Sequence, residues 1–313
     1  MKNHKKNLPG IIIICGPTGI GKTALTTSLY KKFPSVIISA DSVSVYKYMD
    51  IGSAKPTKEE NKKYPHNLID ICLPDEDFDA GKFLDLAEQI IYQAHNEKKT
   101  TIISGGTGLY IKTLTNGIFR NKPADKKILT SLYEKEKNFG RGYLYGELKK
   151  IDPEASKKIH KNDIFRLARA VECYISTGTK ISTLQKNQRN SRKEKFKFLK
   201  IGLSMERKNL YKRIEKRVDI MIKQGLVKEV EALREMGYNT NLKSMNSIGY
   251  KQINMYLDNK IQLEEAIGLI KRDSRRYAKR QMTWFNAQKD IAWISPDDIE
   301  GASRLIEAFL KTT

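Results

Sequence analysis

Residues 11–23, IIIICGPTGIGKT, give the strongest indication of the fold of this chain. Five apolar residues, Ile11–Cys15, run directly into a glycine-rich segment, Gly16–Thr23, that fits the pattern G-x-x-x-x-G-K-[ST]. This pattern belongs between a buried strand and a helix, and Thr23–Tyr30 has the composition of such a helix start. Glycines let backbone N–H groups surround phosphate oxygens, and the lysine adds a cation. The sequence therefore predicts a phosphate-binding P-loop, with the Thr23 hydroxyl as a ligand for Mg²⁺.

Short apolar runs and helical patterns alternate through the N-terminal third of the chain. A second run, Val36–Ser39, ends shortly before Asp41, and Phe83–Asn96 places its apolar residues on one broad helical face. A third run, Thr101–Ser104, precedes Gly105 and Gly106. Strand and helix alternation of this kind favours a parallel sheet covered by helices on both faces. We expect an α/β fold of the P-loop NTPase type.

The character of the sequence changes after Gly117, where helical patterns continue without a convincing strand. Asp152 followed by proline resembles a helix N-cap, and Asn162 or Asp163 is placed to cap a helix that ends before Gly178. The polar, basic segment 186–195 is expected to be an exposed loop.

A returning strand is predicted at Phe196–Leu203, followed by helices from Glu206 onward. The predicted organisation is a catalytic core with C-terminal helices, residues 1–116 and 197–313, interrupted by an all-helical insertion domain at 117–196.

The charge of the chain points to a polyanionic partner. The 313 residues include 58 Lys and Arg against 36 Asp and Glu, a net charge of +22. Phosphate contacts by such side chains drive nucleic-acid binding, although a generally lysine-rich surface is the ordinary alternative. No apolar run approaches the ~18 residues of a membrane span, and the run after the basic N-terminus is too short for a signal peptide. Three widely spaced cysteines fit reduced thiols in the cytoplasm.

Two features at the expected ligand-binding edge bear on the chemistry. A P-loop NTPase usually shows a magnesium-binding Asp after the third strand, and here Ser104 and two glycines occupy that place. That weakens the interpretation as an ATPase. Asp41 follows the second strand, where the ligands of such sheets bind, so it is a candidate general base; a cap for the next turn is the alternative.

Eight ordered motifs together resemble one family, the tRNA dimethylallyltransferases or tRNA isopentenyltransferases, over nearly the whole chain. They are the P-loop, ADSVSVYKYMDIGSAKP at 40–56, PHNLID at 65–70, GGTGLY at 105–110, Asn162-Asp163 with Arg166, Leu167 and Arg169, the set Arg213, Arg217, Met221 and Gly225-Leu226, GYKQ at 249–252, and YAKRQ with Thr283-Trp284 at 277–284.

The resemblance implies transfer of a dimethylallyl group from dimethylallyl diphosphate to N6 of adenosine 37 in the anticodon stem-loop of tRNAs that read U-initial codons. It implies catalytic roles for Asp41, Thr107, Lys22 and Arg217, with Mg²⁺ as the cofactor. The diphosphate-binding residues it implies are Gly16, Pro17, Thr18, Gly19, Ile20, Gly21, Lys22 and Thr23. The tRNA-binding residues it implies are Asp41, Ser42, Val43, Ser44, Thr107, Phe165, Arg166, Leu167, Ala168, Arg169, Asn246, Ser247, Ile248, Gly249, Tyr250 and Lys251.

The sequence departs from the family pattern at two places. Leu129 lies near a position where an Arg is often found, and Asn246 and Ser247 stand where Arg and Cys are common. The basic stretches 186–200 and 271–280 are either RNA-phosphate contacts or solvated charged faces.

Other functions remain open at this stage. A P-loop kinase of a small metabolite needs no basic insertion, and a non-catalytic RNA-binding protein needs no P-loop together with Asp41. A related enzyme prenylates free adenine nucleotides, which need no extended RNA surface. We expect a cytoplasmic monomer that binds tRNA and dimethylallyl diphosphate and does not associate with a membrane.

Overall fold

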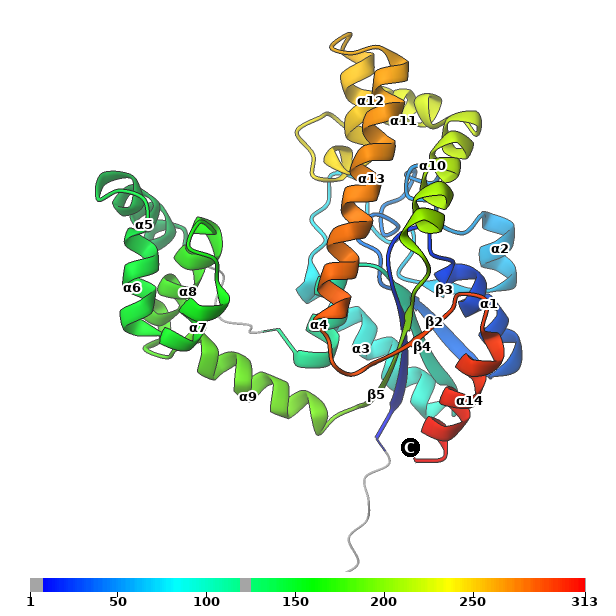
Figure 1. Cartoon of the computed structure of the whole chain (residues 1–313), viewed down its shortest axis with the longest axis horizontal. Coiled ribbons are helices and arrows are strands. Elements are labelled where there is room, and N and C mark those ends of the chain that lie inside the picture. The colour runs from blue at the N-terminus through cyan, green and yellow to red at the C-terminus, as the bar shows by residue number, and fades with distance from the viewer. Residues whose placement is uncertain (1–7, 119–124, 313) are drawn as a thin grey trace, which may run out of the picture. The chain divides into compact units, whose positions relative to one another are not determined.

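The protein, analysed as a computed structural model, is described for residues 8–118 and 125–312 (Figure 1). It divides into two compact units, residues 1–111 with 196–313 and residues 112–195. In the described part of the chain, no helix is both long enough and apolar enough to cross a membrane.

The first unit is built on a six-stranded sheet in the order β3-β2-β4-β1-β5-β6, with every neighbouring pair parallel. The strands are β1 (Gly10–Cys15), β2 (Ser35–Ser39), β3 (His66–Asn67), β4 (Thr100–Gly105), β5 (Lys197–Leu203) and β6 (Ile291–Ile294). The α/β fold and the strands expected at 11–15, 36–39, 101–104 and 196–203 are thereby confirmed. The two edge strands, β3 and β6, had no clear signal in the sequence.

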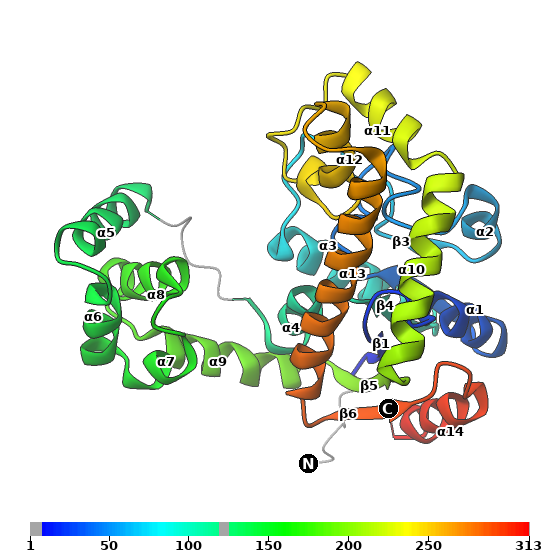
Figure 2. The same cartoon turned by 45° about the horizontal axis from the view of Figure 1, so that its top comes forward.

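Helices cover both faces of this sheet, which explains the continuous apolar run of β1. Ile11–Ile14 are fully buried, as expected for a central parallel strand packed on both sides. Figures 1 and 2 show α3 on one face and α1 with α14 on the other. The helices assigned to this unit are α1 (Lys22–Lys32), α2 (Lys58–Lys63), α3 (Ala80–Asn96), α10 (Arg207–Lys223), α11 (Leu226–Glu235), the 3-10 helix η1 (Ser244–Asn246), α12 (Tyr250–Leu257), α13 (Leu263–Asn286) and α14 (Ile299–Leu310), while α4 (Gly108–Asn116) runs across the boundary.

The second unit is helical throughout its described residues. Its helices are α5 (Lys126–Asn138), α6 (Tyr143–Ile151), α7 (Pro153–Lys158), α8 (Ile164–Thr177) and α9 (Ile181–Lys193). The expected caps are present: Asp152 accepts from the N–H of Ala155 at 3.0 Å, and Asp163 accepts from that of Arg166 at 3.1 Å. Gly178 ends α8 with a left-handed φ of 68°.

The prediction of a loop at 186–195 is wrong, because α9 continues through this segment to Lys193. Lysine, glutamine and arginine are good helix formers, so a polar composition does not by itself end a helix. Arg192 is 3% exposed, and its Nε donates to the carbonyl of Leu114 at 2.9 Å. The basic composition of this segment therefore does not mean that all its cations face solvent.

A glycine at the end of β4 gives a direct test of the packing at the sheet edge. A Cβ on Gly105 would lie 2.1 Å from the carbonyl oxygen of Ala40, so we expect Gly105→Ala to lower the free energy of unfolding by at least ~1–3 kcal/mol. Gly268, inside α13, has open space around it, and Gly268→Ala should raise the free energy of unfolding by about 0.5–1 kcal/mol. Denaturant unfolding of both variants measures the contrast; equal stability of the two would contradict it.

Candidate active site

Three loops meet at the edge of the sheet where β1, β2 and β4 end. The strands are parallel and in register, so their carboxyl ends lie together. The N–H of Ala40 donates to the carbonyl of Ser104 at 2.8 Å, and the N–H of Thr107 donates to that of Ala40 at 3.1 Å. These bonds tie the loop that carries Asp41 to the loop that carries Thr107, next to the P-loop at the end of β1.

The P-loop has the backbone geometry that its glycines allow. Gly19 and Gly21 have φ values of 79° and 113°, which side chains disfavour. Gly21 precedes α1 and has no side chain to cap it, so the first N–H groups of the helix are left for another acceptor. Lys22 Nζ donates to the carbonyls of Gly16 at 3.0 Å and Pro17 at 2.9 Å. The lysine thus lies back over the loop, next to the place where an anion would bind.

Burial lowers the pKa of Lys22 to about 8, an effect that the Asp41 carboxylate opposes and the Arg217 cation reinforces. Burial also lowers the pKa of Arg217. Two partly desolvated cations in one cavity repel each other and are stabilised by a bound anion. The site is therefore electrostatically prepared for a multiply charged anionic ligand.

Two helices from the C-terminal half complete the P-loop environment. Arg217 of α10 donates from Nη2 to the hydroxyl of Thr18. Gln281 of α13 accepts from the N–H of Thr18 at 2.8 Å and donates to the carbonyl of Gly106, also at 2.8 Å. One amide side chain thereby links the P-loop to the loop after β4.

Asp41 caps the following turn and also lines the cavity. Its Oδ1 accepts from the N–H groups of Val43 at 2.9 Å and Ser44 at 3.3 Å. Thr107 lies beside it, where its hydroxyl accepts from the N–H of Ser42 at 3.1 Å. The capping bonds fix the carboxylate in place, so capping and a role in proton transfer are compatible.

Two adjoining cavities meet at Asp41. The first, about 190 Å³, is lined by the P-loop, by Ser53–Pro56, by His66 and by Gly105-Gly106. The second, about 310 Å³, has an apolar wall together with residues 246–249. They share five lining residues: Thr18, Asp41, Ser53, Arg217 and Tyr277. One cavity is rich in cations and backbone N–H groups, the other offers an apolar surface, and a carboxylate stands where they join.

The two cavities divide most of the predicted P-loop and RNA residues of the first unit between them. Thr18, Gly19, Gly21, Lys22 and Thr23 line the first, whereas Ile20 is buried in the core and does not line it. Ser42, Val43, Asn246, Ser247, Ile248 and Gly249 line the second, and Ser44 lines the first. Lys251 is exposed.

Tyr250 differs from its neighbours, because its side chain is fully buried. The ring is therefore closed to direct contact with RNA, and its hydroxyl donates to Glu229 inside the protein.

In the helical unit, the predicted RNA-binding residues 165–169 lie on two faces of α8, one exposed and one buried. Phe165 is 68% exposed and Arg166 lies at the surface, while Leu167 and Ala168 are fully buried in the core of that unit. Arg169 forms an ion pair with the buried Glu172. Side-chain contact with RNA thus stays a prediction for Phe165, Arg166 and Arg169, and Leu167 and Ala168 act through packing. Leu129 packs against the same core and carries no charge in place of the missing arginine.

Several cavity residues carry no individual signal in the sequence. Gln281 and Tyr277 lie within the YAKRQ motif, and Ser53 and Lys55 within the motif at 40–56, so motif membership was the available signal. Burial raises the pKa of Tyr277 to about 12, with a further contribution from Asp41. Tyr277 is therefore a neutral hydrogen-bonding group and not a base at physiological pH.

The end of β4 carries no acid. The Ser104 hydroxyl there accepts from that of Thr26 at 2.9 Å. Among the described residues that line the first cavity, Asp41 alone has a carboxylate, and no cluster of three or more His, Cys, Asp or Glu side chains forms a metal site in the described chain. The Thr23 hydroxyl suits a hard cation that takes its remaining ligands from water and from substrate phosphates.

Comparison with known proteins agrees with this arrangement. A model of the IPP transferase family matches residues 44–288. The chain is 43% identical over 301 residues to a tRNA dimethylallyltransferase of Acetivibrio thermocellus, covering 96% of each chain, and 45% identical over 284 residues to tRNA dimethylallyltransferase 2 of Geotalea uraniireducens, covering 91% of each.

Solved structures give the same result. The full-length tRNA isopentenylpyrophosphate transferase of Bacillus halodurans superposes with a TM-score of 0.70 at 37% identity, covering 97% of this chain and 95% of that one. A eukaryotic dimethylallyltransferase acting on tRNA superposes with a TM-score of 0.77 at 29% identity, covering 93% of this chain and 75% of that one. On the strength of its sequence, its fold and the loops that form its cavities, this chain belongs to the IPP transferase family.

Proposed function

We propose that this protein is a tRNA dimethylallyltransferase. It transfers the dimethylallyl group of dimethylallyl diphosphate to N6 of adenosine 37 in tRNAs that read U-initial codons, and releases diphosphate. The observation that carries the proposal is the placement of Asp41 where a cationic phosphate cavity adjoins a cavity with an apolar wall. Alkyl transfer between two substrates needs a site that binds the leaving group, a cavity that admits the adenine base, and a proton acceptor between them.

The P-loop side acts on the leaving group. As the bond between C1 of the donor and the diphosphate oxygen breaks, negative charge accumulates on that oxygen, and preorganised donors stabilise it. Lys22, Arg217 and the N–H groups of the P-loop provide these donors. Removal of one such donor costs a factor of roughly 10²–10³ in rate in comparable sites. The Thr23 hydroxyl would hold Mg²⁺, which would further neutralise this charge.

Asp41 acts on the nucleophile. The exocyclic amine of adenine attacks C1 with its electron pair, and the proton it must lose passes to the Asp41 carboxylate. Thr107 is placed to assist, because its hydroxyl is held against the N–H of Ser42, next to Asp41. The new C–N bond, the broken C–O bond and the transferred proton balance without a redox partner.

The RNA must deliver an unstacked adenine. Bases in a single-stranded loop can be splayed out and read at their edges, whereas a paired base cannot. The loop 246–249, which lines the second cavity, and the exposed Phe165 and Arg166 are the contacts we assign to the anticodon stem-loop. A kinase needs none of these surfaces, and the lack of an acid after β4 also disfavours it.

Transfer itself is the test of this proposal. Protein, Mg²⁺, dimethylallyl diphosphate and a tRNA with adenosine 37 should yield tRNA in which one dimethylallyl group replaces a hydrogen of that nucleoside, as read by mass spectrometry of nuclease fragments. The same tRNA with guanosine at position 37 is the control and should stay unmodified. Unmodified substrate tRNA combined with transfer of a phosphate from ATP would contradict the proposal and favour the kinase.

The role of Asp41 is tested by replacing its carboxylate with an amide. Asn can still accept the N–H of Val43 through Oδ1, so Asp41→Asn should keep the loop while lowering kcat by ~10²–10⁴. The dissociation constant for tRNA should change by less than about threefold, since binding rests on many contacts.

Single-turnover kinetics and filter binding separate these two effects. Asp85→Asn, at an exposed position of α3, is the matched control. Equal losses of tRNA binding and turnover in Asp41→Asn would speak against a base.

A further inference from the structure

The segment 46–56 carries Ser53 and Lys55 to the first cavity. Its backbone adopts an unfavourable conformation at two residues. Tyr48 and Ala54 adopt φ values of 67° and 51° without being glycine. Conformations of this kind persist only where the surroundings determine them. Lys55 supplies one anchor, because its Nζ donates to the carbonyl of Tyr46 at 2.8 Å and forms ion pairs with Asp50 and Asp70.

A second anchor comes from Glu229 of α11, far away in the sequence. Its Oε2 accepts from the N–H groups of Asp50 at 2.9 Å and Ile51 at 2.7 Å, and its Oε1 accepts from that of Gly52 at 3.1 Å. Three successive N–H groups thus converge on one carboxylate, in the way that backbone turns bind anions. Hydrogen bonds to an ionised acceptor are about twice as strong as neutral ones.

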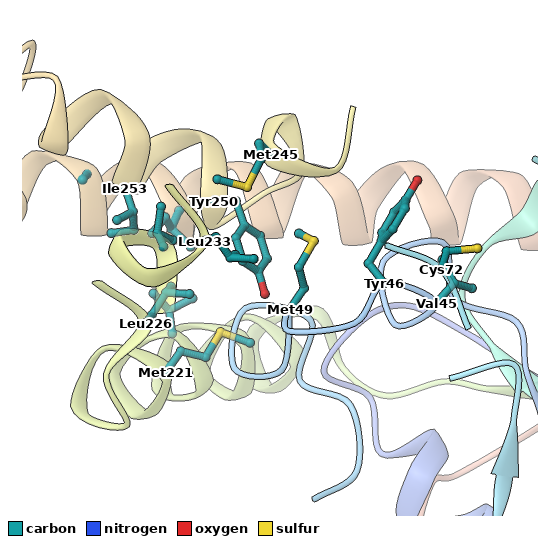
Figure 3. Packing of buried hydrophobic residues seen from close by; sticks show 14 residues of the cluster. Val45, Tyr46, Met49, Cys72, Met221, Leu226, Leu233, Met245, Tyr250 and Ile253 are labelled. Atoms are coloured by element: carbon teal, nitrogen blue, oxygen red, sulfur yellow. The ribbon is translucent and has the colours of Figure 1, made fainter. Parts of the chain in front are cut away.

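Tyr250 of the GYKQ motif completes the arrangement. Its hydroxyl donates to Glu229 Oε1 at 2.6 Å, and its ring packs so closely on Gly52 that an added Cβ would lie 2.4 Å from it. Figure 3 shows the ring beside Met49 of the same segment, within a buried cluster that includes Met221 and Leu226. Tyr250 therefore contacts both the Glu229 carboxylate and the segment 50–52 that this carboxylate binds.

The first residue of the motif, Gly249, lines the second cavity. Residues 246–249 line that cavity, and the N–H of Gly249 donates to Gln252 Oε1 at 2.9 Å. Gln252 in turn donates to Asp273 of α13 at 2.9 Å. Gln252 thereby links Gly249 to α13, while Glu229 and Tyr250 contact residues 50–52.

We propose that Glu229 is a positioning residue for the reaction, which together with Tyr250 keeps residues 50–53 in the conformation that binds the diphosphate donor. Glu229 itself is absent from the lining of both cavities, so it acts through Ser53 and Lys55 in the first cavity and through Gly52 and Ser53 in the second. The inference rests on the proposed function for the identity of the donor. It explains why a tyrosine that is fully buried belongs to the motif next to the RNA-facing loop.

The test compares Glu229→Gln with Glu231→Gln, an exposed position on the same helix. An amide in place of the carboxylate presents N–H groups to backbone N–H donors, so at least one of the bonds to residues 50–52 is lost. We expect the KM for dimethylallyl diphosphate to rise at least about tenfold, the size of one charge-assisted hydrogen bond. Turnover at saturating donor should fall less, and the tRNA dissociation constant should stay within about threefold.

The increase in the KM for dimethylallyl diphosphate should grow with the number of contacts that a substitution removes. Tyr250→Phe keeps the ring and loses one hydrogen bond, so its effect on donor KM should be smaller than that of Glu229→Gln, and Glu229→Ala should exceed both. Restoring the carboxylate through Glu229→Asp should recover part of the donor affinity. A merely structural role predicts a lower active fraction, which lowers apparent kcat and leaves KM unchanged.

Two measurements need no turnover and separate this inference from the proposed function. Hydrogen exchange of the amides in 46–56 should speed up in Glu229→Gln and not in Glu231→Gln, and direct titration of dimethylallyl diphosphate should show the weakened binding. Unchanged exchange in this segment, or a donor KM and dissociation constant within about twofold of wild type, overturns the inference. Failure of the wild type to modify tRNA while it still binds the donor overturns the proposed function alone.

Discussion

The structure depends on one close approach, between Gly105 at the end of β4 and the backbone of Ala40 after β2. Parallel strands in register end at a common edge, and a side chain at position 105 would separate the two loops there. The contact brings Asp41 and Thr107 next to the P-loop, and Gln281 then links that loop to Gly106. The site is therefore a consequence of strand alignment and of small residues where the strands end.

The electrostatics of the site follow from this geometry. Burial lowers the pKa of both Lys22 and Arg217, and the Arg217 cation lowers that of Lys22 further. An anion with several charges removes this penalty, and Asp41 alone does not. The same P-loop that holds triphosphates elsewhere can thus hold the diphosphate of an alkyl donor, because its chemistry recognises phosphate oxygens and not the group attached to them. What separates the two uses is the absence of an acid after β4 and the presence of Asp41.

Local patterns in the sequence predicted the features that are encoded locally. The P-loop context, the caps at Asp152 and Asp163 and the left-handed Gly178 each depend on a few neighbouring residues, and the structure confirms them. The two edge strands had no such signal, since β3 has only two residues and β6 is half-buried. The length of α9 was missed because a polar composition suits helix and loop alike.

Tertiary contacts explain the remaining differences. Glu229 belongs to no local motif, and only folding brings it to residues 50–52. Tyr250, Leu167 and Ala168 lie in motifs that the family resemblance assigns to RNA, yet all three are buried. A family motif marks which residues belong together, and burial decides which of them contact a ligand and which hold the others in place.

Calorimetric titration tests the claim that the P-loop cavity holds the diphosphate of an alkyl donor. With Mg²⁺ present, the dissociation constant of dimethylallyl diphosphate should be at least about tenfold lower than that of ATP. Because Lys22 loses its proton above its pKa of about 8, affinity should fall as pH rises through that value, and Lys22→Met should bind weakly at every pH. Tighter binding of ATP, or donor binding that Lys22→Met leaves intact, would contradict the claim.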